Sequence, residues 1–421
     1  EIPKEISNLI ELEVLDLAAN SFSGSLPMEI FNISRLRVIS LSFNNLSGSL
    51  PPNMCSVIPN IEVIYLTFTN LVGTIPHSIS NCSKLTRLEL AGFFGDYICK
   101  FQHLGAIYVG QNQLSGSLPN CLGNITSNIP PSLGSLQDLV VLDLSSNNMV
   151  GSLPPRIGNL KSATKMDLSM NQFSNGIPRE IGELQNLAHL SLRHNKLQGA
   201  IPDSMSNMGN LPQEITRLRR LKFLDLSFNN FSGKVPSWIE VIAFTGNSLS
   251  GSLPNGLCNG VPILEGLYLS YNKLHGHMPT SLANCSQLQL LSLTGNEFDG
   301  PIHSEIGRLS TLQFLYLGSN HFTGEIPKEI SNLIELEELD LSTNNFSCSL
   351  DMETFNISGL RILGLTDNDL SGSLPPNIGS MLPNIEVLYL GNLTNLVGTI
   401  PHSISNCSKL TIPELTTNSQ A

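Results

Sequence analysis

The chain repeats one short unit, and the length of that unit restricts the folds it can adopt. Asn147, Asn171 and Asn195 close three successive units and lie 24 residues apart, each behind the same pattern of apolar residues. Self-similarity at a fixed short period is typical of stacked-coil architectures, and a single unit of this size cannot bury enough apolar surface to fold alone. For the 421 residues we therefore expect a solenoid rather than several globular domains.

Within one unit the residues predict a strand followed by a returning arc. Leu139, Leu142 and Leu144 give the short apolar alternation of a strand with one face inward. Gly151 permits a bend, and Pro154 opens an arc that leads back to the next strand. Each period is thus predicted to form one coil, and the strands of stacked coils would align into a parallel sheet.

An asparagine closes the strand segment of most coils. A turn packed between neighbouring coils leaves backbone groups away from water, and an Asn amide offers both donors and an acceptor to satisfy them. The marker asparagines are Asn20, Asn44, Asn112, Asn147, Asn171, Asn195, Asn229, Asn247, Asn272, Asn296, Asn320, Asn344 and Asn368.

These residues resemble the plant-type leucine-rich repeat, LxxLxxLxLSxNxLxGxIPxxIGxL, over essentially the whole chain. The segments IPKEISNLIELEVLDL, SGSLPPN and GTIPHSISNCSKL are most similar to ectodomains of plant receptor-like kinases and receptor-like proteins, especially the pattern-recognition-receptor group. The resemblance implies an α/β solenoid: a right-handed superhelix with a concave parallel β-sheet, a second short sheet and short helical or 3-10 arcs on the convex side. It also implies terminal caps, a transmembrane segment and a kinase domain, so the sequence is interpreted as a fragment without them.

Residues 1–421 are predicted to form a single solenoid with faults. The marker spacing departs from multiples of 24, which predicts irregular junctions near 91–103, 123–131, 205–215 and 237–247. Residues 2–90 recur almost word for word at 326–415, as a tandem duplication or a rearranged gene would give.

Composition and motifs limit the functions. The net charge is −12 and only 13% of residues are charged, which does not fit a nucleic-acid partner. No apolar run is long enough to cross a membrane, so membrane contact by this segment is not expected. GxSxG, HExxH, phosphate-loop and kinase motifs are absent from the sequence. We therefore expect no enzymatic activity, no cofactor and no metal site.

Three cysteines share one position of the repeat, and sequons for N-glycosylation occur along the chain. Cys82, Cys285 and Cys407 occupy one arc column where other coils place an apolar residue, which predicts buried free thiols. Sequons for N-glycosylation occur about as often as composition predicts by chance. They are at Asn32, Asn45, Asn81, Asn124, Asn230, Asn284, Asn345, Asn356, Asn392 and Asn406.

The residues between and just after the strand leucines should face the concave solvent side. Aromatic and basic residues recur there in a chain with 6% aromatics, which suits an extended peptide anchored in shallow pockets. The candidate ligand-binding residues are Tyr65, Arg87, Tyr108, Lys165, His189, Arg193, His194, Phe223, Phe228, Tyr268, Tyr271, Phe314, Tyr316 and Tyr389.

Three functions remain open. The first is an extracellular, plasma-membrane-anchored receptor ectodomain that binds a peptide or microbe-derived ligand, with a leucine-rich-repeat co-receptor as a partner, in immune or developmental signalling. The second is a secreted inhibitor of a microbial polysaccharide-degrading enzyme, similar to polygalacturonase inhibitors. The third is a gene fragment without a ligand. A membrane span and kinase motifs in the same transcript would select the first.

Overall fold

The fold is described from a computed structural model of the chain. It describes residues 1–71, 76, 78–79, 82–89, 104–108, 110, 115–116, 138–205, 220–235, 241–258, 264–393 and 395–414. The chain divides into unit 1, Glu1–Asn229, and unit 2, Asn230–Ala421. Each unit is built of stacked coils and is described by itself.

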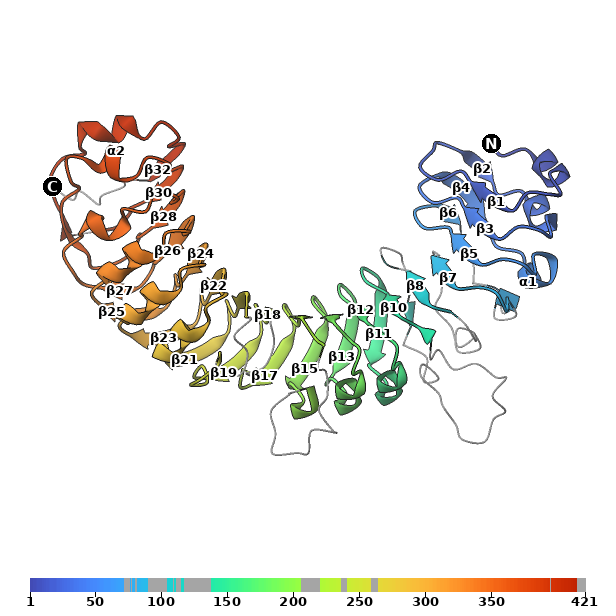
Figure 1. The fold of residues 1–421 in the computed structure, drawn as a ribbon, viewed down its shortest axis with the longest axis horizontal. Coiled ribbons are helices and arrows are strands. Elements are labelled where there is room, and N and C mark those ends of the chain that lie inside the picture. The colour runs from blue at the N-terminus through green and yellow to red at the C-terminus, as the bar shows by residue number, and fades with distance from the viewer. Residues whose placement is uncertain are drawn as a thin grey trace. The chain divides into compact units, whose positions relative to one another are not determined.

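The main sheet of each unit consists of parallel three-residue strands, one from each coil, lying side by side along one face (Figure 1). Unit 1 contributes β1 (Val14–Asp16), β3 (Val38–Ser40), β5 (Val63–Tyr65), β7 (Arg87–Glu89), β8 (Ala106–Tyr108), β10 (Val141–Asp143), β12 (Lys165–Asp167), β14 (His189–Ser191) and β16 (Phe223–Asp225). Unit 2 contributes β18 (Val241–Ala243), β20 (Gly266–Tyr268), β22 (Leu290–Ser292), β24 (Phe314–Tyr316), β26 (Glu338–Asp340), β28 (Ile362–Gly364), β30 (Val387–Tyr389) and β32 (Ile412–Glu414).

A second set of short parallel strands follows the marker asparagines. In unit 1 it comprises β2 (Ser23–Ser25), β4 (Asn45–Gly48), β6 (Asn70–Leu71), β9 (Ser115–Gly116), β11 (Asn148–Ser152), β13 (Gln172–Asn175) and β15 (Lys196–Ala200). In unit 2 it comprises β17 (Asn230–Gly233), β19 (Ser248–Gly251), β21 (Lys273–His277), β23 (Glu297–Gly300), β25 (His321–Gly324), β27 (Asn345–Phe346), β29 (Ser371–Gly372) and β31 (Asn395–Leu396).

Short helices form the returning arcs on the side away from the main sheet (Figure 1). Most are 3-10 helices. Pro154, Pro178 and Pro327 each directly precede one of them, with φ between −66° and −71°, because the fixed φ of proline suits the first turn of a helix. Unit 1 has η1 (Lys4–Asn8), η2 (Met28–Asn32), α1 (Met54–Val57), η6 (Pro155–Asn159), η7 (Arg179–Glu183) and η8 (Asp203–Met205). Unit 2 has η10 (Thr280–Asn284), η11 (Ser304–Arg308), η12 (Lys328–Asn332), η13 (Met352–Phe355), α2 (Ile378–Met381) and η14 (His402–Asn406).

The core of each unit lies between its main sheet and its arcs. The middle residue of strands such as β10, β14 and β24 (Leu142, Leu190 and Leu315) is fully buried. The first residue of these strands is partly exposed, and the third is partly exposed or, at Ser191, buried. Phe298, Phe322 and Phe346 stack one above another, with ring centroids 6.1 and 6.2 Å apart. The predicted α/β leucine-rich-repeat solenoid with a parallel sheet and 3-10 arcs is thereby confirmed.

Marker asparagines such as Asn320 bridge neighbouring coils, as predicted, whereas Asn112 lies outside the described residues. The Asn320 amide donates to Leu317 O of its own coil and to Leu293 O of the preceding coil, both at 3.0 Å. Its Oδ1 accepts from the backbone N–H of Phe298 at 3.1 Å. The same pattern recurs at Asn44 and Asn344, so a buried turn obtains its hydrogen bonds from one side chain per coil.

The prediction of free thiols at Cys82 and Cys285 is wrong. Each forms a disulfide with a cysteine of the preceding coil, Cys55–Cys82 and Cys258–Cys285, with Cα atoms 5.1 Å apart in both. Only Cys407 of that column is a buried free thiol.

The geometry of the arcs explains these disulfides. Cys55 occupies the column that holds Gly158 in other coils, and there adjacent arcs come very close: a β-carbon on Gly158 would collide with the Glu180 carbonyl of the next arc. A cysteine in this column therefore faces the next coil. Cys407 has glycine, Gly379, at the corresponding position of the preceding coil, so no thiol faces it there.

The irregular junctions predicted at 91–103 and 123–131 lie outside the described residues, as do residues 206–215 and 237–240 of the other two. A single solenoid over residues 1–421 and the junctions themselves stay predictions.

Candidate functional site

The concave face is defined here by four positions in each coil: the first and third residues of the main-sheet strand and the two residues before the marker asparagine. All candidate ligand-binding residues occupy these positions within their own unit. None of their side chains is fully buried. They are therefore not needed to fill the core.

The residue directly before the marker asparagine has left-handed backbone, with φ from 51° to 56° at the non-glycine positions. This conformation turns the chain three residues after the main-sheet strand ends, and it is uncommon for bulky residues. In unit 1 the position holds Phe43, Phe68, Met170, His194 and Phe228, so the turn carries large side chains at the margin of the concave face.

Phe43 and Met170 were not identified from the sequence as candidate ligand-binding residues. Phe43 is 55% exposed and its ring stacks on Phe68 at 4.4 Å, and Met170 is 54% exposed. Both residues directly precede a marker asparagine, as Phe228 does, and this shared position could have identified them from the sequence.

Unit 1 brings Tyr65, Arg87 and Tyr108 together. The Arg87 guanidinium carbon lies 5.1 Å from the centroid of the Tyr65 ring and 4.8 Å from that of Tyr108. Its Nη2 lies 2.8 Å from Oε1 of Glu89 on the same strand. The guanidinium is thus held between two rings and a carboxylate of its own chain, an arrangement that combines cation–π and charge-assisted contacts.

A basic and aromatic patch follows on β12, β14 and β16. The register places Lys165, His189 and Phe223 side by side, and the His189 ring stacks on Phe223 at 4.4 Å. At the other end of the same strands His194 stacks on Phe228 at 4.3 Å.

Arg193 completes this patch, with its guanidinium carbon 5.1 Å from the Phe228 ring centroid. Burial, together with the charge of Lys165, lowers the pKa of His189 below its ordinary value. Burial and the charge of Arg193 lower the pKa of His194 in the same way. At neutral pH Lys165 and Arg193 therefore carry the positive charge of the patch.

The aspartates of the third strand position support the turn. Asp167 Oδ1 accepts from the backbone N–H of Ser169 at 3.1 Å and from its hydroxyl at 2.7 Å, and Asp143 does the same with Ser145. These side chains brace the backbone after each strand, which agrees with their interpretation as part of the repeat.

In unit 2 the candidate residues form separate groups. Tyr271, 62% exposed, covers Gly295 of the next coil, and Tyr268 folds over Gly266. Phe314 and Tyr316 have ring centroids 6.4 Å apart, and the Tyr316 hydroxyl donates to Glu338 Oε2 at 2.5 Å. Burial and this hydrogen bond raise the pKa of Tyr316.

The sequon asparagines within the described ranges are all exposed: Asn32, Asn45, Asn230, Asn284, Asn345, Asn356, Asn392 and Asn406. Asn81 and Asn124 lie outside the described residues. Their occupancy by glycans stays a prediction.

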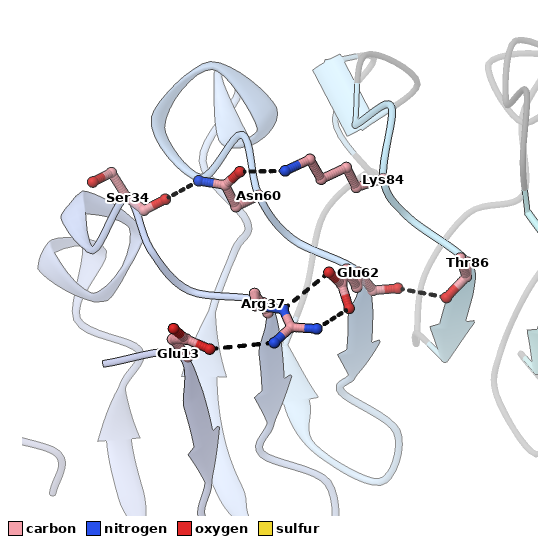
Figure 2. Close-up of polar contacts among 7 residues, drawn as sticks. All are labelled: Glu13, Ser34, Arg37, Asn60, Glu62, Lys84 and Thr86. Carbon is pink, nitrogen blue, oxygen red and sulfur yellow. Dashed lines mark hydrogen bonds and ion pairs between the residues drawn. The ribbon is translucent and has the colours of Figure 1, made fainter. Parts of the chain in front are cut away.

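Ion pairs line the edge of the concave face just before the strands of unit 1 (Figure 2). Arg37 contacts both oxygens of Glu62, at 2.9 and 3.0 Å, and Glu13 at 3.2 Å. Unit 2 repeats the arrangement at Arg361, with Glu386 and Glu337 at the same distances. The duplicated sequence therefore reproduces this group of surface ion pairs.

The candidate residues thus present exposed or partly exposed side chains along the main sheet of each unit. Over the residues that the structure describes, no helix is long and apolar enough to cross a membrane.

The pattern of the Leucine Rich Repeat family matches eight segments of the chain. These are residues 11–33, 35–57, 138–160, 186–208, 220–242, 264–285, 311–333 and 359–381.

Plant receptor proteins are among those that the chain resembles. Receptor-like protein 35 of Arabidopsis thaliana is 37% identical over 92 residues, which is 20% of this chain and 9% of that protein. A plant peptide hormone receptor, RGFR1, solved in complex with RGF2, has a TM-score of 0.85 and 33% identity, over 99% of this chain and 64% of that one. A TDR receptor has a TM-score of 0.74 and 29% identity, over 99% and 65%.

The chain thus matches less than a tenth of that curated relative and under two thirds of either solved receptor chain. It contains leucine-rich repeats and is similar to plant receptor-like proteins and to plant receptor ectodomains.

Proposed function

We propose that this chain is the extracellular ligand-recognition part of a plant receptor and that it binds an extended peptide or microbe-derived ligand along its concave face. The observation that carries the proposal is the placement of aromatic and basic side chains at positions that the core does not use. His189, Arg193, His194, Phe223 and Phe228 form the densest group, with stacked rings and the Arg193 guanidinium beside the Phe228 ring.

Similarity supports the same proposal. The resemblance to a receptor solved with RGF2 covers nearly the whole chain. A membrane anchor, a co-receptor with leucine-rich repeats and a role in immune or developmental signalling complete the proposal, and they concern the whole protein of which this chain is a part.

Panning a random peptide display library against the purified chain tests the proposal. Selected peptides should lose affinity at least tenfold for a chain with Arg193→Ala, His194→Ala and Phe228→Ala. The control is Arg179→Ala, which removes a positive charge from the arc side, where Arg179 is highly exposed. Failure to select any peptide, or equal loss in the control, would contradict concave-face recognition.

The positive charge of the basic and aromatic patch predicts which peptides it binds best. Acidic peptides should bind it in preference to neutral ones, and Arg193→Ala with His194→Ala should weaken an acidic peptide by about 1–3 kcal/mol, the scale of charge-assisted contacts. Isothermal titration with an acidic peptide and its amidated counterpart measures the difference.

A further inference from the structure

The concave face of unit 2 carries a slot with aromatic walls and an acidic floor. The register aligns Tyr316, Asp340, Gly364 and Tyr389 as the third residues of four consecutive strands. At a strand spacing of about 4.8 Å the two tyrosines are roughly 14 Å apart along the sheet. We call these four residues the aromatic slot.

Asp340 lies open at the floor of the slot. Its Oδ1 accepts from the backbone N–H of Ser342 at 2.9 Å, which fixes the carboxylate. Glycines flank it: a β-carbon on Gly318 would lie 2.7 Å from Oδ2, and one on Gly364 would lie 2.8 Å from Oδ1. The neighbouring strand β28, with Gly364, and the turn after β24, with Gly318, thus place no side chain against this carboxylate.

A second carboxylate stands beside the slot. Glu338 begins the strand that carries Asp340, and the Tyr316 hydroxyl donates to it at 2.5 Å. This bond draws the Tyr316 ring from β24 toward β26, onto the side of the slot where the two acids lie.

No cation of unit 2 neutralises the slot from the concave face. Over the described part of the unit, the four concave positions of each coil contain no lysine or arginine. Arg361, at the edge before β28, is already paired with Glu337 and Glu386.

In unit 1, a similar group of two tyrosines and a carboxylate surrounds an arginine side chain of the same chain. There Tyr65, Glu89 and Tyr108 occupy the third positions of three consecutive strands, and the guanidinium between them belongs to Arg87. Tyr389 is the duplicated counterpart of Tyr65, and in the slot the carboxylate between the tyrosines is that of Asp340. Unit 2 has the walls and the acid without an internal cation.

We propose that the aromatic slot binds the cationic side chain of an arginine or lysine in the ligand. A guanidinium satisfies the site best, because its plane can stack on a tyrosine ring while its N–H groups reach the Asp340 carboxylate. The inference rests on the proposed function and adds to it: unit 1 offers a basic patch for acidic groups, and unit 2 offers an acidic and aromatic slot for basic ones.

Two small probes test the slot without knowledge of the ligand. N-acetyl-arginine amide and its neutral isostere N-acetyl-citrulline amide are titrated against the full chain by saturation-transfer NMR. The arginine probe should bind at least tenfold more tightly than the citrulline probe. Asp340→Asn, which can still accept from Ser342, should reduce the arginine affinity at least tenfold, and Tyr389→Leu at least threefold.

The duplication supplies a matched control. Asp16 is the counterpart of Asp340 and accepts from the backbone N–H of Ala18 at 3.0 Å, but Ser40 stands where unit 2 has Gly364. Asp16→Asn should leave the arginine affinity unchanged. Equal affinity for both probes, no binding of the arginine probe, or an Asp340→Asn chain that binds normally would overturn the inference. Library peptides that bind through Arg193 and Phe228 would then still uphold the proposed function.

Discussion

Replacing Asn320 with alanine should destabilise unit 2 strongly. The side chain is 5% exposed and is the hydrogen-bond partner of Leu293 O, Leu317 O and the Phe298 N–H. Leaving a buried donor or acceptor without its partner costs about 1–3 kcal/mol. With three groups affected, we expect a loss of about 3–9 kcal/mol in the free energy of unfolding.

Asn20 provides the matched control. It occupies the same column, but it is exposed and its amide donates to carbonyls of its own coil, Leu17 O at 3.2 Å and Ala18 O at 3.0 Å. Asn20→Ala should cost about 1 kcal/mol or less, because water can replace the amide. Urea unfolding followed by circular dichroism measures both variants. If Asn320→Ala were no more destabilising than Asn20→Ala, bridging of coils by the asparagine column could not be the source of the stability.

Three further predictions concern cross-links, surface charge and pH. Replacing Cys55 and Cys82 by alanine removes a cross-link that spans 27 residues, which should cost about 3.5 kcal/mol of unfolding free energy by the loop-entropy relation, and a reducing agent should then have less effect on the urea midpoint than in the unchanged chain. Arg37→Met should leave that midpoint unchanged at both low and high salt, because Arg37 and its glutamate partners lie at the surface; a large shift would show that the edge ion pairs matter. Burial lowers the pKa of His189 below its ordinary 6.5, so the unfolded chain binds the proton at a higher pH than the folded chain and stability should fall as pH drops below about 6.5. His189→Phe should reduce this loss of stability between pH 7 and pH 5. Urea midpoints measured across that range test it, and a midpoint that depends on pH as steeply as in the unchanged chain would contradict it.

The repeat in the sequence determined the local structure of each coil. The spacing of Leu139, Leu142 and Leu144 predicted a strand with one buried face, and Pro154 predicted the start of the arc. The marker asparagine predicted a bridge between coils, because a buried turn needs donors and an acceptor at that point. These features can be predicted from a single repeat, because every coil buries apolar side chains and a turn at equivalent positions.

Contacts between neighbouring coils were decided by the tertiary structure. The pairing of Cys55 with Cys82 depends on the close approach of two arcs in the glycine column, which no single coil reveals. Likewise, Arg87 lies between Tyr65 and Tyr108 only because the coils stack in that register. The sequence by itself identified which residues leave the core, whereas the distance and stagger between coils determined which of them meet.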